Sequence, residues 1–470
     1  MIHPQILLAA ILIGVPVSGV AAPGQGSHLS GNHRYTLVDS ALDSIHFTVE
    51  KTLKRDPYGH LVSVSSFVDS DGKAMGWHEF GNLEGPGWAA NAVGGAYEIY
   101  TMGDFFHKPE WKATALSLLD HVLDDGFIDN RTGFIRGYRE TTTGKLCLNY
   151  KHNSDWFSPG SMAKMGFQLL IFSEALGNDP RAPRLRKSAV QVAQWIDKHV
   201  ETAPNGWFPR RTTPDGKVYA KSPEGKEDKL WQTSADGLFI LQLDAALTAR
   251  VLADYSPVLR KKTGVFMHAG GFFGSINQDT YDLHEDVAYA VAFRTLLGVS
   301  RVLKDEAIRS FAYEKCLSGL DKFKIREDRN GVATQGLLYM EDSWDTSYLW
   351  EDAEAALAYF EAAQDLRSPD PAGSSAYESE GLVILRAVAK HHHGRYGFLT
   401  EGVDWNNHVG QEHHFEGARF GDIRYTEPFL NNQHICEPTL YYLKNLARKS
   451  STKNGFEWRD AQDNAIFKMP

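Results

Sequence analysis

The chain has 470 residues, 42% of them hydrophobic, and its 49 basic and 59 acidic side chains give a formal net charge of −10. This length is enough for an extensive core, and the acidic balance argues against nucleic acid as a partner. The three cysteines exclude a disulfide scaffold and fit no zinc-binding spacing, so we expect Cys147, Cys316 and Cys436 to be buried thiols.

Residues 1–22 are typical of a secretory signal. An apolar run from Ile6 to Val20 is followed by Ala21 and Ala22, whose small side chains suit signal peptidase. No other stretch approaches the 18 apolar residues that a membrane span needs. We therefore expect a secreted or periplasmic protein. Its mature part, residues 23–470, is predicted to form one domain, because no linker or low-complexity segment divides it.

Amphipathic and strongly apolar stretches alternate along the mature chain. In chain order they predict twelve helices, over residues 39–54, 86–105, 109–125, 158–177, 183–201, 233–254, 257–269, 284–300, 304–323, 347–366, 375–393 and 427–447. Taken two at a time in this order, the twelve helices form six pairs. The first helix of each pair has one polar face and is expected on the outside. The second is apolar around most of its circumference, as in helices enclosed by others. The weakest of the twelve is 257–269, which Gly264 interrupts.

A glycine followed by an apolar or aromatic residue recurs about every 68 residues, after each predicted outer helix. The six pairs are Gly59-His60, Gly133-Phe134, Gly206-Trp207, Gly271-Phe272, Gly331-Val332 and Gly397-Phe398, with His60 and Val332 the poorest matches. Six such units predict a closed ring of helical hairpins.

Each irregular segment after a glycine ends with an acidic and an aromatic residue, just before the next inner helix. If the inner helices run in one direction, these groups converge at one rim, where the helix N-termini also point. They are Trp77-His78-Glu79-Phe80, Asp155-Trp156-Phe157, Asp228 with Trp231, Asp279 with Tyr281, Asp342-Ser343-Trp344-Asp345, and Tyr425 with Glu427.

Twelve alternating helices with acidic and aromatic loops before the inner ones resemble the six-hairpin (α/α)6-toroid superfamily of carbohydrate-active enzymes. The resemblance covers nearly all of the mature chain, and its motifs are architectural. It implies an all-α toroid and a sugar ligand. Members include glycoside hydrolases, unsaturated glucuronyl hydrolases among them, and also polysaccharide lyases and sugar epimerases.

Hydrolysis of a glycosidic bond needs two carboxylates, one protonated as general acid and one that activates water or acts as nucleophile. The acidic residues near predicted inner-helix starts are Asp155, Asp236, Glu285, Asp286, Asp342, Asp345, Glu351, Asp352 and Glu427. Most of them need no explanation beyond the helix dipole. We favour Asp155, Asp236, Asp345 and Glu427 as catalytic candidates, without assigning acid and base.

Sugar clefts combine aromatic faces with charged and amide side chains. The densest such mixture runs from Gly397 to Pro428, although a solvated surface loop would look similar. Adjacent histidines seldom reach one ion together, so we expect no metal site at His408, His413 and His414. We expect no metal and no cofactor elsewhere in the protein either. The predicted substrate-binding residues are Trp77, Trp156, Arg210, Arg211, Trp231, His284, Trp344, Trp405, His408, His413 and His414.

The loops are more basic than the chain as a whole. Residues 131–154 carry five basic side chains against one acidic one, and Arg210 and Arg211 follow in the next loop. Arginine pairs bidentately with carboxylates, so the loops favour a uronic-acid-containing poly- or oligosaccharide, although ordinary solvated charge explains them equally well.

Three other functions remain open. A polysaccharide lyase would use a His or Tyr base next to a uronate, and His152, Tyr281, His284, His408, His413 and Tyr425 supply such groups. Epimerisation is less expected in an exported protein. A non-catalytic sugar-binding protein would use the same aromatic loops.

Overall fold

The computed structural model describes residues 35–63, 67–75, 83–151, 155–276, 280, 282–343, 345–406, 420–453 and 455–469. Residues 1–22, the predicted signal, lie outside this part of the chain. No helix in the described part is long and apolar enough to cross a bilayer.

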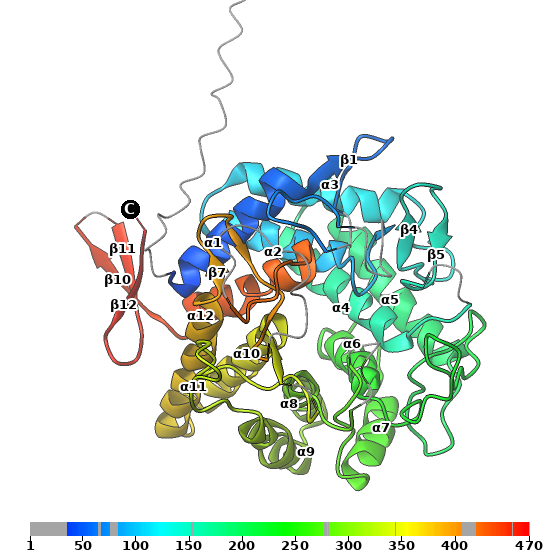
Figure 1. Ribbon diagram of the computed structural model, residues 1–470. Helices are drawn as coiled ribbons and strands as arrows, with labels where there is room; N and C mark the ends of the chain where they lie inside the picture. The colour runs from blue at the N-terminus through cyan, green and yellow to red at the C-terminus, as the bar shows by residue number, and fades with distance from the viewer. Residues whose placement is uncertain are drawn as a thin grey trace, which may run out of the picture.

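Six helical hairpins form a ring, which confirms the predicted all-α (α/α)6 toroid (Figure 1). The outer helices are α1 (Leu37–Phe47), α3 (Pro109–Asp124), α5 (Ala182–His199), α7 (Ser256–His268), α9 (Glu306–Phe311) and α11 (Pro371–Ala389). The inner helices are α2 (Ala92–Phe105), α4 (Pro159–Leu176), α6 (Leu238–Ala249), α8 (Asp286–Leu303), α10 (Leu349–Leu366) and α12 (Cys436–Asn445). Each inner helix packs on the next, and α12 packs on α2, which closes the ring.

Burial separates the two sets of helices as the sequence predicts. In α10, nearly every residue from Leu349 to Ala363 is buried, whereas α5 buries only the stripe that includes Leu185, Val192 and Ile196. The weakest predicted helix is present as α7, where Gly264 faces open space. Helix α9 is short but continues in π- and 3-10-helical turns to Lys322.

The recurring glycines have a common backbone conformation. All six have φ between +79° and +104°, a region that side chains with a Cβ rarely adopt. Each therefore marks the tight turn that follows an outer helix. This conformational need explains why the glycine recurs while its neighbours vary.

The loops between outer and inner helices carry small antiparallel sheets. These are β1 (Leu53–Arg55) with β2 (Leu61–Ser63); β3 (Leu83–Glu84), β4 (Tyr138–Glu140) and β5 (Leu146–Cys147); β6 (Thr346–Tyr348) with β9 (Gly402–Asp404); and β7 (His392–His393) with β8 (Phe398–Leu399). The sheet β3-β4-β5 joins the first two hairpins, because β3 precedes α2 and β4 follows α3.

A C-terminal sheet is an addition that the sequence pattern did not predict. It consists of β10 (Arg448–Thr452), β11 (Gly455–Arg459) and β12 (Ala465–Met469), and it lies at the edge of the ring (Figure 1). Trp458 contacts Phe105 at 5.7 Å between ring centroids, at the C-terminal end of α2. The sheet therefore packs at the opposite end of the inner helices from their N-termini.

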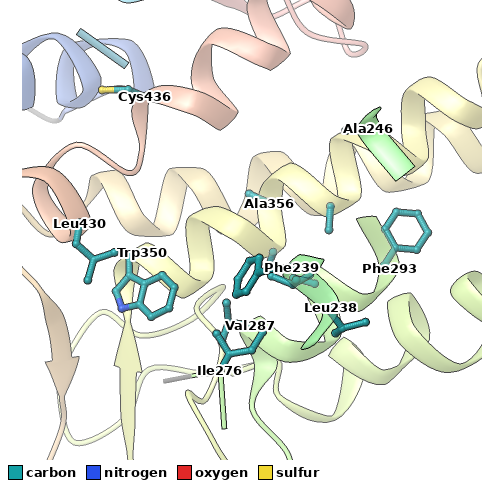
Figure 2. Close-up of a cluster of buried hydrophobic side chains, with 14 of the residues drawn as sticks. Leu238, Phe239, Ala246, Ile276, Val287, Phe293, Trp350, Ala356, Leu430 and Cys436 are labelled. Atoms are coloured by element: carbon teal, nitrogen blue, oxygen red, sulfur yellow. The ribbon is translucent and has the colours of Figure 1, made fainter. Parts of the chain in front are cut away.

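Three aromatic side chains from alternate hairpins meet inside the ring. The Trp88 indole lies 5.6 Å from the ring of Phe239 on α6 and 5.7 Å from that of Trp350 on α10. Figure 2 shows Phe239 and Trp350 in one apolar cluster with Val287. We call Trp88, Phe239 and Trp350 the aromatic plug. All three cysteines are buried free thiols, as predicted.

Candidate active site at the rim of the inner helices

The N-terminal ends of the inner helices touch one another. Asn91 before α2 donates to the Phe429 carbonyl at 3.1 Å, and Trp350 on α10 contacts His434 before α12. Buried carboxyl groups gather at this rim, each at most 3% exposed. They are Asp236, Glu285, Asp286, Glu351, Asp352 and Glu427. The positive ends of the helix dipoles favour negative charge there.

Asp236 lies in the 3-10 turn Ala235–Gly237 that leads into α6, and it is 1% exposed. The Ser158 hydroxyl donates to Oδ2, whereas Oδ1 has no hydrogen-bond partner among the described residues. Burial raises the pKa of Asp236 to about 6, against the opposing effects of the Ser158 hydrogen bond and of Arg210 and Arg211. A carboxyl group with this pKa holds a proton close to neutral pH and can donate it.

An aromatic pocket opens beside Asp236, between the start of α2, the sheet β3-β4-β5 and the start of α4. It is a small cavity of about 30 Å³ that opens to solvent. Its aromatic lining is Trp88, Tyr138, Tyr150, Trp156 and Phe157, and its polar lining includes Asn149, Ser158 and Ser161. These residue types are the ones that line sugar-binding sites.

Local structure fixes the two principal walls of the pocket. Strand β4 places Tyr138, whose hydroxyl accepts a hydrogen bond from the Ala89 amide at 3.1 Å. Asn149 donates to the Trp156 carbonyl at 2.5 Å, and the Arg211 guanidinium lies 5.1 Å from the Trp156 ring centroid. The aromatic faces are therefore held in place before any ligand binds.

One predicted catalytic carboxyl group lies next to this pocket. Ser158 both lines the pocket and donates to Asp236. Glu427 is buried at the same rim, just before the π-helical turn Pro428–Asn432. Burial raises the pKa of Tyr138 in the pocket wall, and the negative charge of Glu427 adds to this increase.

The remaining rim carboxyl groups hold loops together. Burial raises the pKa of Glu285 to about 7, although Thr280 and the Ile276 amide donate to it. Burial likewise raises the pKa of Asp352 to about 7, against hydrogen bonds from the Ser347 hydroxyl and the Leu338 amide at 2.6 and 2.8 Å. These contacts give both residues a structural explanation.

Asp286 and Glu351 form a hydrogen-bonded carboxyl pair between the starts of α8 and α10. Burial raises the pKa of Asp286 well above its usual range. Two carboxyl groups can share a hydrogen bond only when one of them is protonated. Sequence reasoning placed both residues near helix starts but gave no sign that they pair.

The other two catalytic candidates lie elsewhere on the rim. Asp155 is exposed, next to the buried Trp156. Asp345 is exposed too, and the Asn406 side chain donates to it at 2.6 Å. Neither lines the aromatic pocket.

The predicted substrate-binding residues have different surroundings. The side chains of Arg210 and Arg211 are fully buried and ion-paired with Asp228, so they act on the rim through their charge rather than from an exposed surface. His284 is 39% exposed, with Nδ1 2.7 Å from an Asp342 oxygen.

The predicted tryptophans also differ. Trp156 lines the pocket, Trp231 is half-buried, and Trp405 is buried edge-to-face against Tyr339. The remaining predicted ligands lie outside the described residues; they are Trp77, Trp344, His408, His413 and His414.

A charged layer lies one helical turn below the aromatic plug. There the Lys164 ammonium is 3.8 Å from the Trp88 ring centroid, and Glu354 pairs with Arg294 and with His434 Nε2, the latter at 3.0 Å. A cavity of about 40 Å³ between these side chains is lined by residues on or next to all six inner helices. Sequence reasoning missed this layer, although charged residues inside apolar helices were a visible signal.

No family model and no curated protein sequence matches the chain. Among solved structures, the fold is similar to a sugar epimerase from a ruminal bacterium, with a TM-score of 0.60 and 14% identity over 86% of this chain and 97% of that chain. A cellobiose 2-epimerase from Bacillus thermoamylovorans gives a TM-score of 0.59 and 11% identity over 87% and 99%. A family 76 glycoside hydrolase from a Bacteroides thetaiotaomicron strain gives a TM-score of 0.53 and 11% identity over 88% of this chain and 78% of that chain. These relatives are carbohydrate-active enzymes, and at such identities the likeness concerns the (α/α)6 toroid itself.

Proposed function

We propose that the protein is an enzyme that hydrolyses a glycosidic bond in a poly- or oligosaccharide bound in the aromatic pocket. One observation carries this proposal. Asp236 combines deep burial, a pKa raised to about 6 and a direct hydrogen bond to Ser158, a residue of the pocket wall. A carboxyl group in that state is suited to protonate a leaving-group oxygen.

The residues have distinct roles in this mechanism. Tyr138 and Trp156 bind the apolar face of a sugar ring, while Asn149 and Ser161 bind its hydroxyl groups. Asp236 donates its proton to the glycosidic oxygen as the bond to the anomeric carbon breaks. Glu427, as carboxylate, either activates the attacking water or attacks the anomeric carbon itself.

The similarity in fold to a family 76 glycoside hydrolase supports hydrolysis as a reaction that this architecture can accommodate. Asp236 and Glu427 are also two of the four carboxyl groups that the sequence favours as catalytic candidates. The proposal includes export, which rests on residues 6–22 and is checked by sequencing the N-terminus of protein secreted by its source.

The test is a matched pair of carboxyl replacements assayed on a panel of polysaccharides. Asp236→Asn is expected to abolish release of reducing sugar without unfolding the protein. Asp244→Asn is the control, because Asp244 is a buried aspartate on α6, the helix that follows the turn of Asp236, with burial raising its pKa, but it lies outside the pocket. Equal activity of both variants would refute the role of Asp236. Full activity of Asn or Gln variants at Asp155, Asp236, Asp345 and Glu427 alike would refute the whole set.

Epimerisation is the second candidate, because the sugar epimerase and the cellobiose 2-epimerase have the higher TM-scores of the three relatives. Epimerisation next to a carbonyl removes a carbon-bound proton and returns one from solvent. Incubation of reducing disaccharides in D2O, followed by NMR, therefore separates the two reactions. Deuterium at C2 without new reducing ends indicates an epimerase.

The same panel decides the remaining alternatives. An ultraviolet-absorbing unsaturated product indicates a lyase, and binding without turnover indicates a non-catalytic sugar-binding protein. Preference for a uronic acid stays a prediction from the basic loops. Equal activity on neutral and uronate-bearing substrates would contradict it.

A further inference from the structure

Four metal-ligand-type side chains converge at a point outside the aromatic pocket. They are Asp56 and His60, which lie on either side of the Gly59 turn between β1 and β2, and His121 and Asp125, four residues apart at the end of α3. One ligand atom from each lies within 4.8 Å of all the others. The proposed sugar chemistry uses none of these residues.

The distances match a tetrahedral site. Asp125 Oδ2 lies 2.6 Å from His121 Nδ1 and 3.2 Å from His60 Nδ1, and Asp56 Oδ2 lies 3.4 and 3.7 Å from the same two nitrogens. Around zinc, with bonds of about 2.0–2.1 Å, the corners of a regular tetrahedron are about 3.3–3.4 Å apart. The four nitrogen–oxygen separations run from 2.6 to 3.7 Å, on both sides of this value, and all six separations are within 4.8 Å, so one small cation reaches all four atoms after modest movement of the side chains.

Backbone hydrogen bonds orient Asp56 toward this point. Its Oδ1 accepts from the amides of Tyr58 and His60, both at 2.9 Å, and this leaves Oδ2 directed at the imidazoles. Such contacts to the non-ligating oxygen are the usual support of a carboxylate ligand. The Gly59 turn, part of the repeated architecture, thus also positions two of the four ligand residues.

The charges around the point do not balance without a further cation. The side chains of Asp56, Asp125 and Glu84 are 2%, 4% and 7% exposed, and Arg139 is the guanidinium among them. Arg139 Nη2 is 2.6 Å from Glu84 and 3.5–3.6 Å from the two aspartates. With both imidazoles neutral, three carboxylates and one guanidinium leave a net charge of −2, or −1 while Asp56 and Asp125 share a proton in the hydrogen bond between them. Buried negative charge of this kind requires compensation.

We propose that Asp56, His60, His121 and Asp125 form a structural site for a tetrahedral divalent cation, zinc above all. Four protein ligands leave no open position, which is typical of structural rather than catalytic zinc. The cation joins the β1–β2 turn to the end of α3. Because Arg139 contacts the same carboxylates and follows Tyr138 in β4, the site also steadies one wall of the aromatic pocket.

A rival explanation needs no metal. Two protonated histidines would supply the same charge as one divalent cation. The two explanations differ in their response to zinc, because zinc would stabilise the protein only in the first.

The experiment uses untagged full-length protein that has been stripped with a chelator and dialysed. After zinc is added back, we expect elemental analysis to find one zinc ion per chain bound at this site. We also expect the melting temperature to rise by about 3 °C when free zinc is 100-fold above its dissociation constant. His60→Ala removes one ligand at a side chain that is 24% exposed, so the fold tolerates it. This variant should lose that zinc and that rise in melting temperature. The control His46→Ala, at a 40% exposed histidine outside the cluster, should retain both.

Cobalt provides a second measurement that needs no variant. Co²⁺ in the stripped wild-type protein should give the intense visible bands of four-coordinate cobalt, and zinc should displace them. Wild-type protein that takes up no zinc would overturn the proposal. So would a His60→Ala variant that binds as much zinc as wild type, or a pale six-coordinate cobalt spectrum.

Discussion

Asp236 at the rim and Asp125 at the end of α3 are both buried aspartates, but their surroundings differ. Asp236 receives one hydroxyl hydrogen bond, and its Oδ1 has no partner among the described residues. Asp125 lies within 4 Å of two imidazoles and a guanidinium. With few donors, burial favours the protonated acid. Around Asp125, the two imidazoles and the guanidinium supply several donors to one carboxyl group. The number of surrounding donors is therefore what separates the two roles that we propose, a proton donor for Asp236 and a metal ligand for Asp125.

The largest expected effect is the loss of activity when Asp236 at the rim is replaced. Asp236→Asn keeps the shape of the side chain but removes its proton, so kcat on the responsive substrate should fall by about 10²–10⁴-fold. Steady-state kinetics with a melting curve for each variant measures this. The buried Asp244→Asn control should stay within about threefold of wild type.

The next effect concerns the cluster at α3. Arg139→Met leaves Glu84 and the two aspartates without their guanidinium, and breaking a buried ion pair in this way costs about 3–5 kcal/mol. Urea unfolding measures the loss. Partial recovery on addition of zinc would strengthen the metal proposal, and a loss below about 1 kcal/mol would show that Arg139 is not the counter-charge.

The rim should be less stable as pH rises. The pKa of Asp236 is about 6 in the folded protein and 3.8 in the reference state, so its contribution is full below pH 3.8 and is lost as pH rises through 6. The shift corresponds to about 3 kcal/mol in the unfolding free energy between pH 4 and 7. Asp236→Asn should remove this part of the pH dependence, and a variant with an unchanged slope would contradict it. The rate of a wild-type reaction that needs the protonated acid should decline above about pH 6.

Ser158→Ala tests the pKa of Asp236 at the residue that both donates to Asp236 and lines the pocket. Its hydroxyl stabilises the ionised carboxylate, so its removal should raise the pKa of Asp236 and move the high-pH decline in rate to higher pH. Ser158 also caps α4 by accepting from the Ser161 amide at 3.0 Å, and losing this cap should cost about 1 kcal/mol. A pH profile and a melting curve measure the two effects separately.

The smallest effect concerns the repeated turns. Gly59→Ala introduces a Cβ into open space, so only the positive φ of +89° opposes it, at about 1 kcal/mol. At Gly133 a Cβ would also lie 2.4 Å from the Gln191 carbonyl carbon, so Gly133→Ala should be clearly more destabilising. An equal decrease in the free energy of urea unfolding for the two variants would contradict the predicted clash at Gly133.

The fold was largely predictable because its signals are local. Apolar periodicity distinguished enclosed helices such as α10 from exposed ones such as α5, and a left-handed turn needs glycine wherever it recurs. The sheet β10-β11-β12 escaped because its first strand is exposed and polar throughout, with no alternating pattern. Its packing depends on Trp458, whose partner Phe105 is distant in the sequence.

The site was less predictable because its members meet only in three dimensions. Asp155 was favoured as a catalytic candidate because it precedes Trp156. The sequence does not determine that Trp156 turns inward while Asp155 stays exposed. Tyr138 was missed because it comes from a different hairpin than Asp236. One signal was visible for the cluster at α3: His60 was among the poorest matches in the glycine repeat, and it occupies an apolar position with a polar ring.

The aromatic plug lies inside the ring of inner helices. Trp88, Phe239 and Trp350 come from every second hairpin and pack against one another inside the ring, with Trp88 in contact with both of the others. Trp88 also lines the aromatic pocket, so this packing supports the pocket from the side of the ring axis. A substitution at Phe239 or Trp350 should therefore change ligand binding in the pocket, although neither residue lines it.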